Sequence, residues 1–441
     1  MVCIVASGDF FSTYGGGQVY VRSIVDELAK RLVNAHSPEN AVTVISCDVS
    51  FPAEPRKQKY GKTSIYEINP QGNGTSEIRI KELLAWLRPD IVHINGQKPL
   101  FARLCKELGI PSIVTAHHGG IVCPAGTLLN DKDEICQVQA CHQNCLPCYL
   151  ANICTGRFCY PLLKHCSEEN YVKIGRRLKG KKFMPFLTPI GEAALSVKEK
   201  LERWNQLKDA APLFIAPSDA MREALVRNGA HETKVIVLPH GIVLPTDSPM
   251  PSSAPQTPLR FYYAGRICHG KGIHILLKAF HPLAAQAELH LFGGAGNRAD
   301  ERYMKQLQRK YRREPHIIWH GKLPHAQVYD ATSGFSAMLH PTIMLESFGL
   351  NIAEALAQGK WVIATRCGGA EMQIQDQNNG TLVPPNDVCA FRAAIENFIA
   401  RPRSPKVSAV VSIEKHTDKL LEAYSQIREA NLPETFTSIS E

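Results

Sequence analysis

The sequence contains no apolar run long enough to cross a bilayer, which needs about 20 residues. No basic segment precedes the apolar stretch at the amino terminus, so we interpret that stretch as a core strand and not as a signal peptide. These absences lead us to expect a cytoplasmic protein. Internal repeats, C2H2 spacing and aromatic RNA-reading motifs are also missing, which argues against nucleic acid as a partner.

Two common nucleotide-binding signatures are missing from the glycine-rich stretch "STYGGGQVYV", residues 12–21. No Gly-Lys-Ser/Thr follows the glycines, which excludes a Walker A loop. The spacing also fails G-x-G-x-x-G with a later acidic residue, which argues against NAD. The stretch lies between a predicted strand and a predicted helix, whose amino-terminal N–H groups can bind a phosphate or a sugar. Gly16 and Gly17 are therefore candidate ligand contacts, and a simple tight turn is the alternative.

The bulk composition is that of a globular protein with an excess of positive charge. Of 441 residues, 44% are hydrophobic and 21% are charged, which is ordinary for folded domains. The length predicts two or three domains. Lys and Arg number 50 against 41 Asp and Glu, a formal net charge of +9. This balance favours anionic partners such as nucleotides, phosphates or acidic lipid surfaces.

Short apolar runs alternate with helical patterns along most of the chain, which indicates parallel strands joined by crossover helices and an α/β fold class. A Pro- and Ser-rich stretch at residues 246–258 is the predicted linker. We expect an amino-terminal domain at 1–245, a carboxyl-terminal domain at 259–410, and a helix at 411–430 that packs back on the first domain. Two doubly wound domains would face each other across a cleft and bind a ligand at the carboxyl ends of their strands.

The stretch "AGRICHGKG" follows a predicted strand of the second domain and precedes a helix. Arg266 offers a bidentate fork to phosphate, and Lys271 adds a compact charge. We interpret the pair as a diphosphate clamp, and a solvated basic turn is the alternative. In the first domain, "VTAHHGG" places His117 and His118 after an apolar strand. Either side chain could hydrogen-bond a ligand hydroxyl, although histidines at strand ends are more often structural.

Two glutamates, Glu346 and Glu354, stand eight positions apart in "MLESFGLNIAEALAQGK". On one helix this spacing would separate them by about 12 Å along the axis, whereas a glycosidase pair needs carboxyls about 5–9.5 Å apart. The spacing therefore favours two carboxylates that hold two ends of one long ligand. The backbone N–H groups of "SFG", between them, would face the same ligand at a helix start. We expect Glu354 to sit in its apolar segment because its partner is the ligand and not another side chain.

Cysteines and cations crowd one part of the first domain. Eight of the fourteen cysteines lie between Cys123 and Cys166, in an insertion at about residues 121–170. A structural metal, reduced packed thiols and disulfides all stay open there, and no metal is expected at the active site. The stretch at residues 171–187 carries six cations and no acid. It is either a docking site for an anionic membrane surface or a solvated basic face.

The stretch "ESFGLNIAEALAQGKWVIAT" resembles the signature of the retaining, nucleotide-sugar-dependent glycosyltransferases of the GT-B fold, family 4, also known as glycosyl transferases group 1. Glu346 and Glu354 carry its E-x7-E pattern. Other stretches of the sequence also resemble the family and occur in the order typical of it: "GGGQVYV", "APS", "PHG", "AGRICHGKG", "WHGKLPH" and "GGAEMQIQDQNNGTLVPPND". The resemblance covers about residues 2–430, and it implies a fold of two Rossmann-like doubly wound domains.

The resemblance implies roles in the second domain. Glu354 would bind the ribose hydroxyls of the nucleotide and Glu346 the hydroxyls of the donor sugar. Arg266 and Lys271 would neutralise the departing diphosphate. The backbone of Ser347, Phe348 and Gly349 would contact the donor.

The resemblance also implies that Gly16 and Gly17 face the donor diphosphate or the acceptor, and that His117 lies near the anomeric centre. This chain has His117-His118-Gly119-Gly120 where many relatives have His-Asp, which leaves open which histidine acts. Ser347 replaces a common Gly, and His240 replaces a frequent Asn.

The implied activity is transfer of a hexose-type sugar from a UDP- or GDP-sugar to a glycan or lipid-linked acceptor in cell-surface polysaccharide or glycolipid synthesis. No further cofactor is expected. The enzyme would be cytoplasmic, with peripheral docking on the inner face of the membrane as an option. A nucleotide-sugar epimerase or phosphorylase of the same fold, and a non-catalytic sugar-nucleotide-binding protein, are the competing functions.

Overall fold

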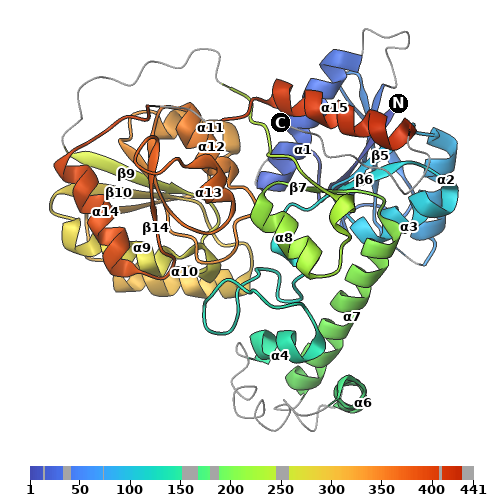
Figure 1. Cartoon of the computed structure of the whole chain (residues 1–441), viewed down its shortest axis with the longest axis horizontal. Helices are drawn as coiled ribbons and strands as arrows, with labels where there is room; N and C mark the ends of the chain where they lie inside the picture. Colours follow the sequence, from blue (N-terminus) through green and yellow to red (C-terminus); the bar gives the residue numbers. More distant parts are fainter. Residues whose placement is uncertain are drawn as a thin grey trace. The chain divides into compact units, whose positions relative to one another are not determined.

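The computed structural model describes residues 1–12, 15–32, 41–72, 74–150, 167–178, 188–244, 258–406 and 410–429. The contacts divide the chain into two compact units (Figure 1). Unit 1 comprises Met1–Asp9, Ala29–Leu238 and Leu421–Glu441, and unit 2 comprises Phe10–Leu28 and Pro239–Leu420. The predicted linker lies largely outside the described residues, so the domain limits given above stay predictions. None of the described helices is both long enough and apolar enough to span a membrane.

Unit 1 contains an eight-stranded sheet in the order β3-β4-β2-β1-β5-β6-β7-β8. All its neighbouring pairs are parallel except β3 with β4. The strands are β1 (Val2–Ser7), β2 (Val42–Cys47), β3 (Arg56–Tyr60), β4 (Thr63–Ile68), β5 (Ile91–Ile94), β6 (Ser112–Thr115), β7 (Phe214–Ala216) and β8 (Val235–Val237). Strand order reverses between β1 and β5, and such a switch point is where ligands bind in open α/β sheets.

The helices of the amino-terminal half follow the crossover pattern. They are α1 (Gly16–Leu32), α2 (Ser76–Leu87), α3 (Lys98–Leu108), α4 (His142–Leu150), α6 (Glu168–Leu178), α7 (Thr188–Ala210) and α8 (Asp219–Arg227), with short 3-10 turns η1 (Gly119–Ile121) and η2 (Glu232–Lys234). The contact division runs through α1, whose Gly16 end belongs to unit 2.

Unit 2 contains a six-stranded, wholly parallel sheet in the order β11-β10-β9-β12-β13-β14. The strands are β9 (Leu259–Ala264), β10 (Ala287–Phe292), β11 (Ile317–Gly321), β12 (Ala337–His340), β13 (Trp361–Thr365) and β14 (Gly380–Val383). This is the 3-2-1-4-5-6 order of doubly wound dinucleotide-binding folds, with its switch point between β9 and β12. The α/β class and the doubly wound architecture predicted from the sequence are confirmed.

Helices cover both faces of this sheet because alternate residues of each strand point to opposite sides. Phe261 of β9 belongs to a core cluster with α9, α10 and α14, whereas Tyr262 belongs to a second cluster with α11, α12 and α13. Figure 1 shows the same two layers. The helices are α9 (Ile273–Phe280), α10 (Arg298–Lys310), α11 (His325–Thr332), α12 (Leu350–Ala357), α13 (Gly369–Gln373) and α14 (Val388–Ala400), with 3-10 turns η3 (His269–Lys271) and η4 (His281–Leu283).

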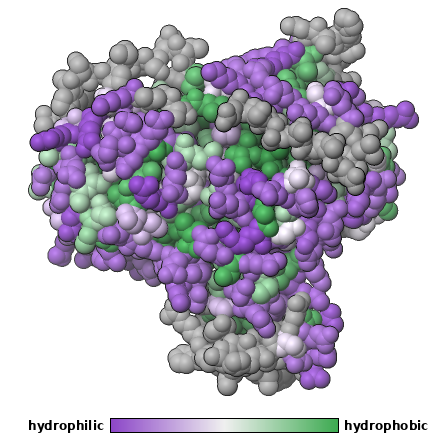
Figure 2. All heavy atoms as spheres, viewed as in Figure 1, coloured by the Kyte–Doolittle hydropathy of each residue, from purple (hydrophilic) through white to green (hydrophobic). Residues whose placement is uncertain are grey.

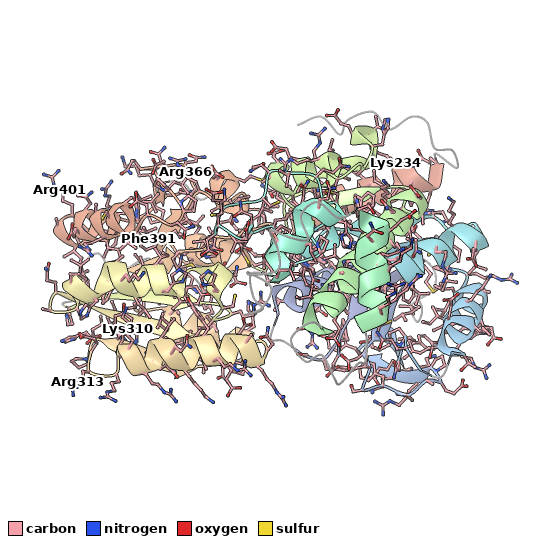
Figure 3. All side chains as sticks on the ribbon, turned by 90° about the horizontal axis from the view of Figure 1, so that it is seen from below. Lys234, Lys310, Arg313, Arg366, Phe391 and Arg401 are labelled. Atoms are coloured by element: carbon pink, nitrogen blue, oxygen red, sulfur yellow. The ribbon has the colours of Figure 1, made fainter. Side chains whose placement is uncertain are left out.

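Polar side chains lie on the outer faces of these layers. Phe391 of α14 is fully buried and points into the unit, whereas Arg401, just past the end of the same helix, is exposed and points outward (Figure 3). The last described helix, α15 (Ile413–Glu429), is amphipathic, and Figure 2 shows hydrophilic side chains along its visible face. Its Tyr424 hydroxyl lies 2.7 Å from Nδ1 of His93 in β5, so the carboxyl-terminal part of α15 packs in unit 1.

The switch point of unit 2 depends on a close backbone approach at Gly272. This residue has a φ of 68°, and a Cβ there would lie 1.9 Å from the carbonyl oxygen of Pro341. Hydrogen bonds from the Ile343 N–H (2.9 Å) and the Met344 N–H (3.1 Å) to the carbonyl of Gly270 join the same two loops. The loop after β9 is therefore held directly against the loop after β12.

We expect Gly272→Ala to lower the free energy of unfolding by at least about 3 kcal/mol, since the new methyl group forces the two loops apart in addition to the cost of the left-handed backbone. Gly321→Ala is the matched control. It has a φ of 76° in the same unit but open space around its Cβ position, so only the backbone cost of about 1–2 kcal/mol applies. Urea unfolding measures both, and equal losses would contradict the close approach.

Candidate active site at the switch point of the second sheet

Glu346 lies at the switch point, and both its main-chain N–H and its carbonyl form hydrogen bonds. Its N–H donates to the carbonyl of Cys367 at 2.8 Å, and its carbonyl accepts from the N–H of Gly369 at 2.8 Å. These bonds tie the loop after β12 to the loop after β13. Glu346 therefore precedes α12 in an extended segment, while Glu354 lies on α12 itself.

The Glu346 carboxylate forms an ion pair with the ammonium of Lys271, and its Oε2 lies 3.2 Å from Nε2 of His340. Only 12% of the Glu346 side chain and 15% of the Lys271 side chain are exposed. Burial raises the pKa of Glu346, but the charge of Lys271 and the contact with His340 outweigh burial and hold the pKa well below its usual range. The carboxylate is therefore charged at neutral pH and acts as a hydrogen-bond acceptor.

His340 is the residue that the sequence analysis did not identify at this site. It ends β12, is fully buried, and has a pKa lowered by burial in spite of its contact with Glu346. The Nδ2 of Asn351 lies 3.3 Å from Nδ1 of His340 and donates to the carbonyl of Ala264 at 2.8 Å. Since an amide nitrogen only donates, Nδ1 accepts and the neutral ring carries its proton on Nε2. This nitrogen lies near the Glu346 carboxylate, but its geometry does not form a hydrogen bond with it.

Arg266 lies two residues past the end of β9, directly after Gly265, and its side chain is exposed. A Cβ at Gly296 would lie 2.9 Å from Cδ of Arg266, so the arginine stem rests on the loop after β10. The same loop lines a cavity of about 660 Å³, which is bounded by Gly293, Gly294, Ala295, Gly296, Asn297, Glu301, Met304, Gln308, Trp319, His320, Gly321 and Lys322. A cation therefore stands beside a pocket at the carboxyl ends of β10 and β11.

The expectation that Glu354 has no side-chain partner is wrong. Oε1 of Glu354 lies 2.6 Å from Nε2 of His325, and 25% of the Glu354 side chain is exposed. His325 begins α11, which packs on the same face of the sheet as α12. The hydrogen bond to Glu354 raises the pKa of His325 against the opposing effect of burial. Glu354 tolerates its apolar segment because a histidine 29 residues away pairs with it.

The other predicted residues of unit 2 surround the start of α12. Ser347 and Phe348 are buried, and Gly349 is the residue from which α12 starts. Gln373 donates to the carbonyl of Phe348, which fixes this loop against α13. Gly16, at the start of α1, lies close enough that a Cβ there would be 3.5 Å from Cδ1 of Leu350. Gly17 is the second residue of α1.

In unit 1 the two candidate histidines have different positions. His118 is exposed and caps η1, since its Nδ1 accepts from the N–H of Gly120 at 3.0 Å. His117 is half-buried, and its Nε2 lies 2.7 Å from Oδ1 of Asn95. The capping contact ties the ring of His118 to its own turn, whereas the ring of His117 contacts the residue after β5. The assignment of His117 as the ligand-binding histidine stays a prediction.

The cysteine-rich insertion is only partly described. Cys123, Cys136, Cys141, Cys145 and Cys148 are the described cysteines of the insertion, and Cys154, Cys159 and Cys166 lie outside the described residues. Among the residues that the structure describes, no three His, Cys, Asp or Glu side chains are grouped to hold a metal ion. The choice between metal, thiols and disulfides stays open. Of the basic stretch at 171–187, the part after residue 178 is not described.

The geometry of unit 2 suits an anionic ligand with hydroxyl groups. Arg266 and Lys271 follow β9 at the edge where phosphates bind in doubly wound sheets, and Glu346 and Glu354 offer carboxylate acceptors nearby on the next loop and helix. Fixed cations and acceptors of this kind stabilise charge that develops during group transfer.

Comparison with known sequences agrees with this chemistry. Residues 247–409 match the family described as Glycosyl transferases group 1, and residues 14–131 match the one described as Glycosyltransferase Family 4. Together these matches cover more than half of the chain.

Among curated proteins, the putative colanic acid biosynthesis glycosyltransferase WcaL of Escherichia coli K12 is 26% identical over 200 residues, which is 44% of this chain and 49% of the relative. The phosphatidylinositol N-acetylglucosaminyltransferase gpi3 subunit of Schizosaccharomyces pombe is 30% identical over 178 residues, 40% of this chain and 39% of the relative. The chain thus matches about half or less of the length of these curated relatives.

Among solved structures, HepE of Anabaena in complex with UDP and glucose superimposes with a TM-score of 0.63 at 16% identity, over 96% of this chain and 99% of that one. The sucrose-phosphate synthase of Thermosynechococcus elongatus gives a TM-score of 0.60 at 18% identity, over 97% of each chain. At these identities the likeness establishes the fold alone.

Proposed function

The chain belongs to the glycosyl transferases group 1 family, whose members have the GT-B fold, and we propose that it moves a sugar from a nucleoside-diphosphate donor to a glycan or lipid-linked acceptor. The observation that carries the proposal is the buried Lys271–Glu346–His340 cluster at the switch point of the second sheet. Arg266 lies five residues before Lys271, in the same connection after β9. Fixed charges at this edge of the sheet support a site for a diphosphate and a sugar.

The donor is a hexose-type nucleotide sugar. Solved structures of the same fold contain UDP, UDP-glucose, or UDP with glucose, which supports a UDP-sugar over a GDP-sugar. The cavity beside Arg266 has room for the nucleoside, and its position at the ends of β10 and β11 is where a nucleoside lies in a doubly wound sheet. Glu354 then accepts from the ribose hydroxyls, and Glu346 accepts from hydroxyls of the donor sugar.

Charge stabilisation is the source of the rate enhancement. The sugar carbon gains positive character as the bond to the nucleoside diphosphate breaks, and negative charge grows on the departing diphosphate. Arg266 and Lys271 bind that charge without reorganisation because their positions are fixed by the fold. The backbone of Ser347, Phe348 and Gly349 orients the donor, and the acceptor attacks on the face that the diphosphate leaves, which retains configuration.

We expect the acceptor to bind the amino-terminal part of the chain, with His117 and the first two residues of α1, Gly16 and Gly17, as candidate contacts for the donor sugar, its diphosphate or the acceptor. One curated relative is named a putative colanic acid biosynthesis glycosyltransferase and another a phosphatidylinositol N-acetylglucosaminyltransferase subunit, which supports cell-surface polysaccharide or glycolipid synthesis as the setting. A lipid-linked acceptor would bring the enzyme to an anionic membrane surface. Lys173, Arg176 and Arg177 are exposed on α6 and are the described cations that would contact it.

Arg266→Ala tests the diphosphate assignment. We expect the kcat for sugar transfer to fall by about 100-fold, since one fixed donor to developing charge is typically worth that much, while the Kd for the nucleoside monophosphate changes little. Arg401→Ala is the control, because Arg401 is also exposed but points outward from unit 2 (Figure 3).

Release of nucleoside diphosphate in the presence of acceptor, measured for UDP-glucose, UDP-galactose, UDP-GlcNAc and GDP-mannose, reports both the activity and the donor. Normal turnover in Arg266→Ala would contradict the assignment of Arg266 to the donor diphosphate. Failure of the wild-type protein to transfer from any donor would contradict the proposed function.

A further inference from the structure

Asn95 lies at the switch point of the first sheet, directly after β5. It is 4% exposed, its N–H donates to the carbonyl of Val5 in β1 at 2.9 Å, and the next N–H, of Gly96, donates to the same carbonyl at 3.1 Å. A Cβ at Gly96 would lie 2.6 Å from the backbone nitrogen of Ser7, so the turn presses against the end of β1. The backbone position of Asn95 is therefore fixed by the central strand.

Lys98 fixes the other side of this turn. Its ammonium donates to the main-chain carbonyl of Asn95 at 2.6 Å from the first residue of α3. Burial lowers the pKa of Lys98 to about 8. Lys98 is half-buried, and its hydrogen bond to the main-chain carbonyl offsets part of the cost of removing the ammonium from water. The bond fixes the residue whose side chain contacts His117.

The side-chain amide of Asn95 has one orientation in which both its oxygen and its nitrogen form hydrogen bonds. Oδ1 lies 2.7 Å from Nε2 of His117, and Nδ2 is directed at the carbonyl of His93, 3.4 Å away. A carbonyl oxygen only accepts, so the amide nitrogen must face it and the amide oxygen must face His117. His117 then donates from Nε2, and in the neutral ring Nδ1 is the accepting nitrogen.

The neighbouring histidines are engaged differently. Nδ1 and Nε2 of His93 lie 2.7 Å from the Tyr424 hydroxyl and 2.6 Å from the Thr115 hydroxyl, and the ring is fully buried. His118 caps η1. The titratable groups around the pair thus include His93 on β5, Lys98 on α3 and His118 on η1, and His117 is the one that the buried amide of Asn95 orients.

We propose that Asn95 is a positioning residue that fixes the ring orientation of His117 and its Nε2-protonated tautomer, so that Nδ1 acts as a hydrogen-bond acceptor. An amide achieves this without the charge of a carboxylate, which would favour the imidazolium form and remove the accepting nitrogen. The orientation and the tautomer follow from the two contacts of the Asn95 amide and do not rest on the proposed function.

Histidine-labelled protein tests the proposal without any activity. Long-range proton–nitrogen correlation spectra distinguish the two neutral tautomers, and the signals of His117 are those that vanish in His117→Ala. We expect the Nε2-protonated form in the wild type and a mixture of tautomers in Asn95→Ala. In Asn95→Asp we expect the pKa of His117 to rise by about one pH unit or more, because a carboxylate replaces the amide.

Activity gives the second readout. We expect Asn95→Ala to lower kcat/KM by about 10- to 100-fold, as for other residues that orient a working histidine, and Asn95→Asp to move the acidic limb of the pH profile upward by the shift seen in the spectra. A wild-type His117 protonated on Nδ1, or unchanged His117 signals in a folded Asn95→Ala protein, would overturn the proposal. Absence of transfer in the wild type would contradict the proposed function and leave the spectra as the test of Asn95.

Discussion

Replacing Lys271 with alanine is expected to abolish sugar transfer and to destabilise unit 2 at the same time. The Glu346 side chain is only 12% exposed in the wild type, and the variant leaves the neutral ring of His340 as its remaining neighbour of the pair. Breaking a buried ion pair from one side typically costs about 3–5 kcal/mol, and removing a fixed cation from the leaving group costs about 10²–10³-fold in kcat. Urea unfolding and initial rates of nucleoside diphosphate release measure the two effects.

The double variant Lys271→Ala/Glu346→Gln tests the effect on stability. Glutamine keeps the shape of Glu346 without its charge, so we expect most of the lost stability to return. Activity that returned together with stability would mean that Lys271 only stabilises the fold of the site.

The ion pair also predicts a pH dependence. The folded pKa of Glu346 lies below its ordinary value of 4.5, so the contribution to stability is fully present above pH 4.5 and is lost as the pH falls through the folded pKa.

The parallel sheets and their ligand-binding edges were predictable from the sequence because buried parallel strands are short continuous apolar runs. The same rule explains what was missed. Strand β3 has the sequence RKQKY and is an edge strand, largely exposed, so it carries no apolar pattern. It pairs antiparallel with β4, so backbone hydrogen bonds, and not an apolar pattern of its own, hold β3 in the sheet.

The family and the positions of Arg266, Lys271, Glu346 and Glu354 also followed from local motifs. What could not follow was the pairing among them, since Lys271 and Glu346 are 75 residues apart and only the switch-point topology joins their loops. His340 carried a usable signal, because it ends a predicted strand just as His117 nearly does. The same rule, applied to every strand end, would have found it.

Glu354→Gln is expected to weaken binding of UDP by about 10- to 100-fold, because hydrogen bonds from ribose hydroxyls to a carboxylate are worth about 1.5–3 kcal/mol. His325→Ala should weaken it less than about 5-fold, since His325 orients the carboxylate through one bond and does not accept from the ribose. The His325–Glu354 bond raises the folded pKa of His325 above 6.5. Its contribution to stability is therefore fully present below pH 6.5 and is lost as the pH rises through the folded pKa.

Isothermal titration with UDP and with its 2′-deoxy analogue tests whether Glu354 binds the ribose. The change of ligand then serves as the second mutation of a double-mutant cycle. If Glu354 holds the ribose, the wild-type protein loses affinity when the 2′-hydroxyl is removed, and Glu354→Gln loses little more. Equal losses in both proteins would place the 2′-hydroxyl elsewhere. An unchanged Kd for UDP in Glu354→Gln would make the pair with His325 a purely structural link between α11 and α12, and the ribose would then need another acceptor along the cavity beside Arg266.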